Sequence, residues 1–133
     1  MIVGFDPGRD KCGLALADEA GELRAHQSVG SQAVLAAVER WCRHYPIERI
    51  VMGNGTTAGE WQARLREGLS HPVPITLVDE RHSSLEARDR YWKLHPPRGL
   101  LRLVPRGLRT PPGPIDGIVA WLLIERYWQQ ADA

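Results

Sequence analysis

The chain has 133 residues, of which 43% are hydrophobic and 25% charged, and its formal net charge is +1. This length predicts one domain, spanning residues 1–133, and the composition is that of an ordinary globular protein. No apolar run approaches the roughly 20 residues of a membrane span, and the N-terminus lacks the pattern of a secretory leader, which argues against a membrane protein. Cys12 and Cys42 stand far apart, with no disulfide framework and no metal-ligand spacing, so we expect a cytoplasmic protein.

The first part of the chain predicts three short strands, at residues 2–6, 12–18 and 22–29. Their short connections favour adjacent antiparallel strands, a meander. The second strand carries Gly13, Ala15 and Ala17 on one face. Such a row of small residues predicts that another element packs closely against that face.

Helical periodicity begins near Ser31 and ends at Pro46, and apolar strands are predicted at residues 49–53 and 75–80. Two further helix starts, at Thr57 and Ser83, each have a Glu three residues later, which is the capping-box pattern.

Residues 96–114 contain six prolines and three glycines and predict an irregular, mobile loop, after which Pro114 opens the last helix. The element order is therefore βββαβαβαα. Strand–helix–strand units after a meander require parallel pairing, so the class is α/β, with a mixed sheet flanked by helices.

Three acidic residues lie at the ends of predicted strands or at the start of a predicted helix. Asp6 ends the first strand, Glu80 ends the last strand, and Asp116 lies in the first turn of the final helix, beside its apolar stripe. Sites in open sheets lie beyond the carboxyl ends of parallel strands, and a helix packed on the sheet could bring Asp116 beside the other two acids.

Each acid also has an ordinary structural explanation. Asp6 could cap its turn, Glu80 could pair with Arg81, and Asp116 could interact with the helix dipole. Their joint position is harder to explain in this way, because clustered carboxylates repel one another unless a cation joins them. Oxygen ligands without His or Cys favour Mg²⁺ or Mn²⁺ over zinc, and metals held by carboxylates are the usual means of hydrolysing phosphodiesters.

The positive charge is concentrated in one span. From Arg81 to Arg109 there are eight basic residues against two acidic ones, a net charge of +6, which leaves −5 for the rest. This span is either a solvated helix face with a loop or a surface that meets a polyanion. The candidates for binding nucleic acid are Arg9, Lys11, Arg81, Arg88, Arg98, Arg102, Arg106 and Arg109.

Three segments carry a resemblance to a known family: "IVGFDPGRDKCGLALAD" at 2–18, "VDERHSSLEA" at 78–87 and "IDGIVAWLLIERY" at 115–127. In these segments the sequence resembles the YqgF family of the RNase H-like superfamily, relatives of the RuvC-type Holliday junction resolvases. The resemblance implies a five-stranded sheet of order 3-2-1-4-5 with its first three strands antiparallel. It also implies that Asp6, Glu80 and Asp116 are catalytic, metal-binding acids.

The same resemblance implies a nuclease, linked either to maturation of the 5′ end of 16S rRNA or to cutting of Holliday junctions. One departure is "GNGT" at 53–56, where the family usually has a "GLP"-like turn; Gly53 and Gly55 could make a tight turn or admit a phosphate, and the turn is favoured. The alternative function is a nucleic-acid-binding module without catalysis. RNA and DNA substrates, and a monomer or a homodimer, all remain open.

Overall fold

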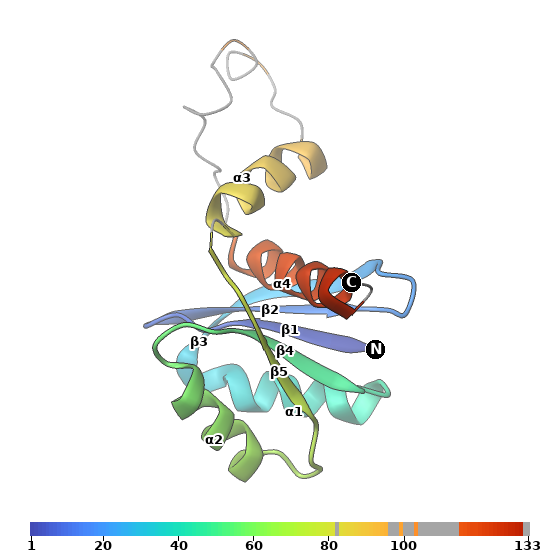
Figure 1. Ribbon diagram of the computed structural model, residues 1–133, viewed down its shortest axis with the longest axis vertical. Coiled ribbons are helices and arrows are strands. Elements are labelled where there is room, and N and C mark those ends of the chain that lie inside the picture. The colour runs from blue at the N-terminus through green and yellow to red at the C-terminus, as the bar shows by residue number, and fades with distance from the viewer. Residues whose placement is uncertain (82, 96–98, 100–102, 104–114, 132–133) are drawn as a thin grey trace.

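The computed structural model describes residues 1–81, 83–95, 99, 103 and 115–131, apart from the side chains of residues 84 and 131. Five strands form one sheet: β1 (Ile2–Asp6), β2 (Lys11–Ala17), β3 (Leu23–Gly30), β4 (Arg49–Gly53) and β5 (Ile75–Val78). The helices are η1 (Ser31–Ala33), α1 (Val34–His44), α2 (Ala58–Gly68), α3 (Ser83–Leu94) and α4 (Asp116–Ala131). Figure 1 shows α1 and α2 on one face of the sheet and α4 on the other, with α3 beyond α4.

The strand order is β3-β2-β1-β4-β5. β1 pairs antiparallel with β2, and β2 antiparallel with β3, whereas β4 is parallel to both β1 and β5. The predicted mixed sheet, its order and its antiparallel meander are therefore confirmed.

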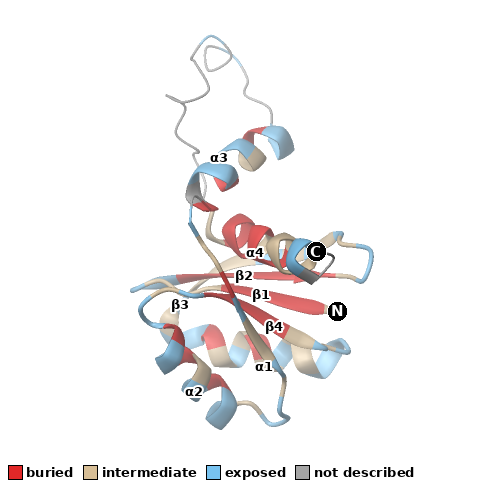
Figure 2. Ribbon diagram, viewed as in Figure 1, coloured by how far each residue is buried: buried red, intermediate tan, exposed pale blue. Residues whose placement is uncertain are grey.

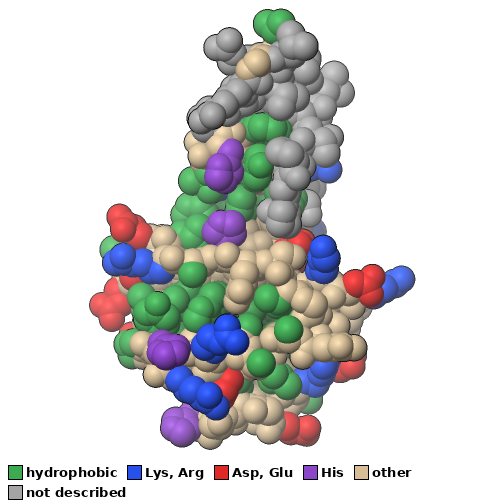
Figure 3. All heavy atoms as spheres, turned by 180° about the vertical axis from the view of Figure 1, so that it is seen from behind, with side chains coloured by type: hydrophobic (Ala, Val, Ile, Leu, Met, Phe, Trp, Pro, Cys, Tyr) green, Lys and Arg blue, Asp and Glu red, His purple; other side chains and the backbone are tan. Residues whose placement is uncertain are grey.

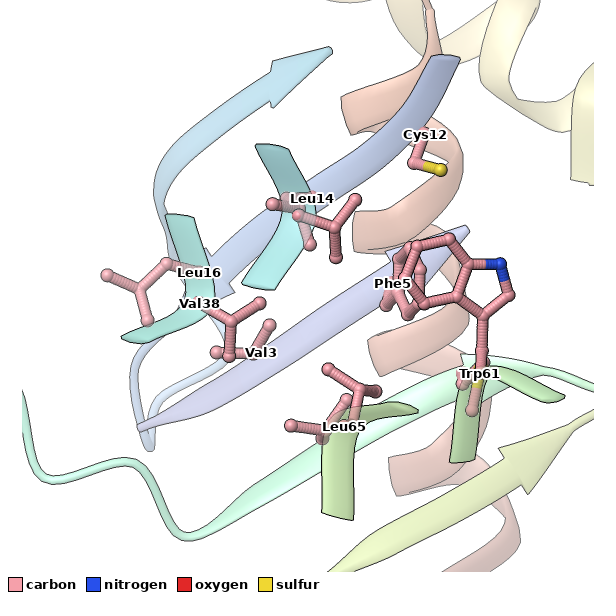
Figure 4. Close-up of a cluster of buried hydrophobic side chains, with 11 residues drawn as sticks. Val3, Phe5, Cys12, Leu14, Leu16, Val38, Trp61 and Leu65 are labelled. Carbon is pink, nitrogen blue, oxygen red and sulfur yellow. The ribbon is translucent and has the colours of Figure 1, made fainter. Parts of the chain in front are cut away.

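The sheet separates two apolar layers. On one face, Val3 and Phe5 of β1 pack with Val38 of α1 and with Trp61 and Leu65 of α2 (Figure 4). On the other face, Leu123 and Ile124 of α4 pack against the sheet. Ile118 and Leu122 of α4 form a further cluster with Ala87 of α3. Figure 2 shows that the buried residues follow the central strands and the sheet-facing side of α4.

The small-residue face of β2 receives α4, as the sequence predicts. Ala15 and Ala17 pack in the cluster formed with Ala120, Leu123 and Ile124 of α4. At Gly13, a Cβ atom would collide with the backbone of Asp116. Because these side chains are minimal, the helix approaches close enough for its first residue to reach the sheet.

Several predicted boundaries need correction. β5 ends at Val78, so Asp79 and Glu80 lie beyond the strand and not within it. α1 follows a short 3₁₀ turn, η1, and starts at Val34. Thr57 is the N-cap of α2 but makes no side-chain capping hydrogen bond, so the capping box predicted there is wrong.

The described helices include none that is both long and apolar enough to cross a membrane. Cys12 is buried and Cys42 partly buried, and both are free thiols. The predicted mobile loop and Pro114 lie outside the described residues, apart from residues 99 and 103.

Candidate active site

One row of paired residues crosses the sheet at the carboxyl end of β1. Asp6 pairs with Gly13 of β2, and Gly13 pairs with Ser28 of β3. On the other side of β1, β4 and β5 run parallel to it and end together, with Gly53 paired to Val78. The carboxyl ends of three parallel strands therefore meet at one edge, as expected for a site in an open sheet.

Asp116 is the first residue of α4, and α4 packs on one face of the sheet, so Asp116 approaches this edge from that face. Its backbone lies directly over Gly13, the partner of Asp6. The Ser28 hydroxyl donates a hydrogen bond of 2.9 Å to Oδ2 of Asp116. Strand pairing and this hydrogen bond thus bring Asp116 to the same end of the sheet as Asp6.

Glu80 reaches the edge from the segment after β5, and two glycines make room for its side chain. A Cβ atom at Gly55 would lie 2.5 Å from Glu80 Oε1, and one at Gly53 would collide with Oε2. Neither glycine has a positive φ, so backbone conformation does not require a glycine at either position. The predicted turn is present, since the carbonyl oxygen of Gly55 accepts a 3.1 Å hydrogen bond from the N–H of Ala58, whereas Gly53 is the last residue of β4. The sequence did not predict that both glycines also make room for the Glu80 carboxylate.

The charges of the three acids act on one another. The pKa of Asp6 is raised from 3.8 to about 7, chiefly because burial penalises the ionised carboxylate and also because the negative charges of Glu80 and Asp116 lie nearby. No ion pair links any of the three acids to a basic group within the described part of the chain. Together they form a half-buried cluster of oxygen donors with excess negative charge.

Such a cluster suits a hard divalent cation such as Mg²⁺ or Mn²⁺, which takes carboxylate oxygens and offsets their repulsion. Among residues 1–81, 83–95 and 115–131, however, no three acidic, His or Cys side chains already stand in the arrangement of a finished metal site. The acids fit the metal in chemistry and in location, and their catalytic and metal-binding roles remain predictions.

A pocket of about 290 Å³ adjoins Glu80. It lies between the β1–β2 turn and the start of α2, and its lining comprises Pro7, Gly8, Arg9, Gly55, Thr56, Thr57 and Glu80. The turn is held by Gly8, whose N–H donates to Sγ of Cys12 over 3.4 Å. This pocket places a basic side chain and two hydroxyls beside Glu80.

The predicted nucleic-acid-binding residues have different surroundings. Arg9 and Lys11 are exposed in the loop and strand that follow Asp6, and Arg88 is exposed on α3. Arg81 pairs with Asp79 at 3.1 Å, and this pair is exposed. Arg98, Arg102, Arg106 and Arg109 lie outside the described residues. On the face seen in Figure 3, the basic and acidic side chains of the described residues are interspersed.

Sequence reasoning missed two groups that hold the edge together. Ser28 is one of them. Only the register of the meander places Ser28 opposite Gly13, and the sequence alone does not specify that register. The other is Arg126 of α4, which donates to the carbonyl oxygen of Asp79 and pairs with Glu86 at 3.0 Å. Arg126 thereby ties the segment that carries Glu80 to α4, whose first residue is Asp116.

Comparison with known proteins places this arrangement in a family. Residues 1–98 match the family described as "RuvX: Holliday junction resolvase". The chain belongs to the RuvX family. The resemblance to YqgF proteins, relatives of RuvC, is thereby confirmed, and the family is one of nucleases.

Relatives of this RuvX chain carry a shared name. A protein of Anaeromyxobacter dehalogenans (strain 2CP-C), named "Putative pre-16S rRNA nuclease", is 37% identical over 105 residues, which cover 66% of this chain and 74% of that protein. A protein of Psychrobacter sp. (strain PRwf-1) with the same name is 28% identical, over 99% of this chain and 79% of its own. The Thermus thermophilus RuvC structure has a TM-score of 0.51 at 15% identity, covering 97% of this chain and 95% of that one, and shows the shared fold.

Proposed function

We propose that this RuvX chain is a metal-dependent endonuclease that hydrolyses phosphodiester bonds in structured nucleic acid. Asp6, Glu80 and Asp116 are the catalytic acids and hold Mg²⁺ or Mn²⁺. The observation that carries the proposal is the meeting of three acids at one edge of the sheet: Asp6 pairs with Gly13, the Asp116 backbone lies over Gly13, and the Glu80 carboxylate lies beside Gly53 at the end of β4. A bound divalent metal activates water for attack on phosphorus and stabilises the leaving oxygen.

Metal binding also requires a change in the protonation of Asp6, and the basic residues around the acids would bind the phosphates of the substrate. Asp6 has to release its proton before it can hold a cation, since its pKa is near 7. Arg9 lines the pocket beside Glu80 and would bind a phosphate next to the one that is cut. Lys11, Arg81, Arg88 and the arginines at 98, 102, 106 and 109 would bind phosphates farther along the strand.

The substrate we propose is structured RNA at the 5′ end of the 16S rRNA precursor, or a branched DNA junction. The names of the relatives favour the first, and the family description favours the second. A cytoplasmic location agrees with either substrate.

The test is cleavage of a labelled precursor-rRNA fragment and of a four-way DNA junction, each with Mg²⁺ and with EDTA. We expect the parent to cut at least one substrate only with metal, and Asp6→Asn to bind that substrate but not cut it. Asp10→Asn is the matched control, since Asp10 is an exposed acid in the next turn. If the parent binds both substrates and cuts neither, the chain is a binding module; if Asp6→Asn cuts at the parent rate, Asp6 is not catalytic.

A further inference from the structure

The three acids differ in what holds them in place. Asp6 is fixed by the ladder of β1, and the Glu80 side chain lies in the space left by Gly53 and Gly55. Asp116 is the first residue of α4. The position of its carboxylate therefore depends on contacts made by the start of α4.

Those contacts come from the neighbouring strands β2 and β3. The Asp116 backbone rests on Gly13, and a Cβ atom at Gly117 would lie 2.7 Å from Nδ1 of His26. These two contacts fix the depth of the helix start but leave the Asp116 side chain free to turn. The Ser28 hydroxyl supplies the missing restraint, because it donates to Oδ2 at 2.9 Å across 88 residues of sequence.

Resting on the function proposed above, we propose that Ser28 is a positioning residue for the metal site. Its hydrogen bond occupies one oxygen of Asp116 and turns the carboxylate so that the other oxygen, Oδ1, is available to the cation. Ser28 lies two strands away from Asp6 in the same cross-sheet row, so the bond ties the outer strand β3 to the acid cluster. Ser28 does not touch the substrate; it acts through Asp116.

The chemical reason is preorganisation. A carboxylate that populates several rotamers loses conformational entropy when it binds a cation, whereas one already held by a hydrogen bond loses less. Hydrogen-bond partners of metal ligands are typically worth about 10–100-fold in metal affinity. Ser28 is half-buried on an edge strand, so removing its hydroxyl leaves the core packing untouched.

The test measures Mn²⁺ affinity by calorimetry, without nucleic acid, so that the readout is independent of cleavage. Ser28→Ala should bind Mn²⁺ about 10-fold more weakly than the parent, and Ser28→Thr, which keeps a hydroxyl, should restore most of the affinity. Thr76→Val, on the opposite edge strand β5, is the matched control: it removes a hydroxyl that accepts a 2.6 Å hydrogen bond from Arg49 of β4. That control should leave Mn²⁺ affinity unchanged.

Each other outcome counts against the inference. Parent-like affinity in Ser28→Ala would overturn it, and so would equal weakening in Thr76→Val, which would indicate a general loss of stability. Failure of Ser28→Thr to recover affinity would show that the hydroxyl is not the cause. If the parent itself bound no Mn²⁺, the proposed metal-dependent function would be contradicted. If the parent bound Mn²⁺ and Ser28→Ala bound it equally well, only the role of Ser28 would be contradicted.

Discussion

At the scale of single residues, the acids depend on the glycines beside them. Glu80 occupies space that a methyl group at Gly53 or Gly55 would fill. The sequence makes Asp6, Glu80 and Asp116 recognisable, because they end a strand, follow a strand and begin a helix, respectively. It does not show why Gly53 and Gly55 are glycines, since their role depends on where a side chain 25 or more residues later is placed.

We therefore expect Gly53→Ala to displace the Glu80 carboxylate and to lower cleavage about 100-fold, as a misplacement of about 1 Å in an active site can. Gly59→Ala is the control, because a Cβ atom at Gly59 meets nothing within 4 Å. That change in α2 should raise the free energy of unfolding by about 0.5–1 kcal/mol and leave cleavage intact. Steady-state cleavage and urea denaturation distinguish the two variants, and equal cleavage in both would contradict the role of Gly53.

Asp6 also predicts a pH dependence of stability in the absence of metal. Its pKa is about 7 in the folded chain against 3.8 ordinarily, so between these values the folded state retains a proton that the unfolded state has lost. The contribution of Asp6 to the free energy of unfolding is then present below pH 4 and falls as pH rises to 7, by roughly 4 kcal/mol at most.

Urea denaturation in EDTA, compared between the parent and Asp6→Asn, measures this contribution. Asp6→Asn should gain stability relative to the parent as pH rises from 4 to 8, because the amide cannot ionise. A difference between the two proteins that stayed constant over this range would show that Asp6 titrates normally. Adding Mg²⁺ should reverse the trend in the parent, since the cation binds the ionised cluster.

At the scale of elements, the position of α4 decides whether the site exists. Periodicity and turn residues sufficed to predict all five strands, because buried strands and amphipathic helices leave strong patterns. The end of β5 and the cap of α2 were wrong because they depend on tertiary contacts. Thr57 matches the capping-box pattern, yet its side chain makes no capping bond in a turn shaped by Glu80 and the β1–β2 loop.

The approach of α4 predicts a stability effect at Gly4. A Cβ atom there would collide with the Ala120 carbonyl oxygen and lie 2.9 Å from Cγ1 of Ile124. We expect Gly4→Ala to lower the free energy of unfolding by about 1–3 kcal/mol, as overpacking does. Gly30→Ala, whose Cβ atom would meet only Asp10 O at 3.9 Å, should be nearly neutral. Chemical denaturation checks both, and a neutral Gly4→Ala would mean that α4 shifts freely on the sheet.

At the scale of the whole molecule, the charges that bear on nucleic-acid binding are those of the acidic edge and of the exposed basic residues close to it in the chain. The basic span noted in the sequence is partly neutralised within the fold, because Arg90 forms a pair with Glu125 at 2.8 Å. Arg9 and Lys11 remain exposed near the acids. We expect these two, more than the total count of arginines, to guide a phosphate chain to the edge.

The double variant Arg9→Ala/Lys11→Ala should bind nucleic acid more weakly and with a flatter dependence on salt. Each lost phosphate contact on duplex DNA reduces the slope of log K against log salt by about 0.9. The control is Arg43→Ala/Arg66→Ala, in the last turns of α1 and α2, which lead to the opposite edge of the sheet. Fluorescence anisotropy in Ca²⁺ gives both slopes, and an unchanged slope in the first variant would mean that the strand binds elsewhere.

Whether the three acids hold a metal is tested most directly by anomalous diffraction from crystals soaked in Mn²⁺. We expect an anomalous peak within about 2.5 Å of carboxylate oxygens of Asp6, Glu80 and Asp116, or two peaks about 4 Å apart if the site holds a pair. The peak should disappear in Asp6→Asn. A well-ordered edge with no peak under conditions in which the parent cleaves its substrate, or a peak bound by other residues, would contradict the metal site.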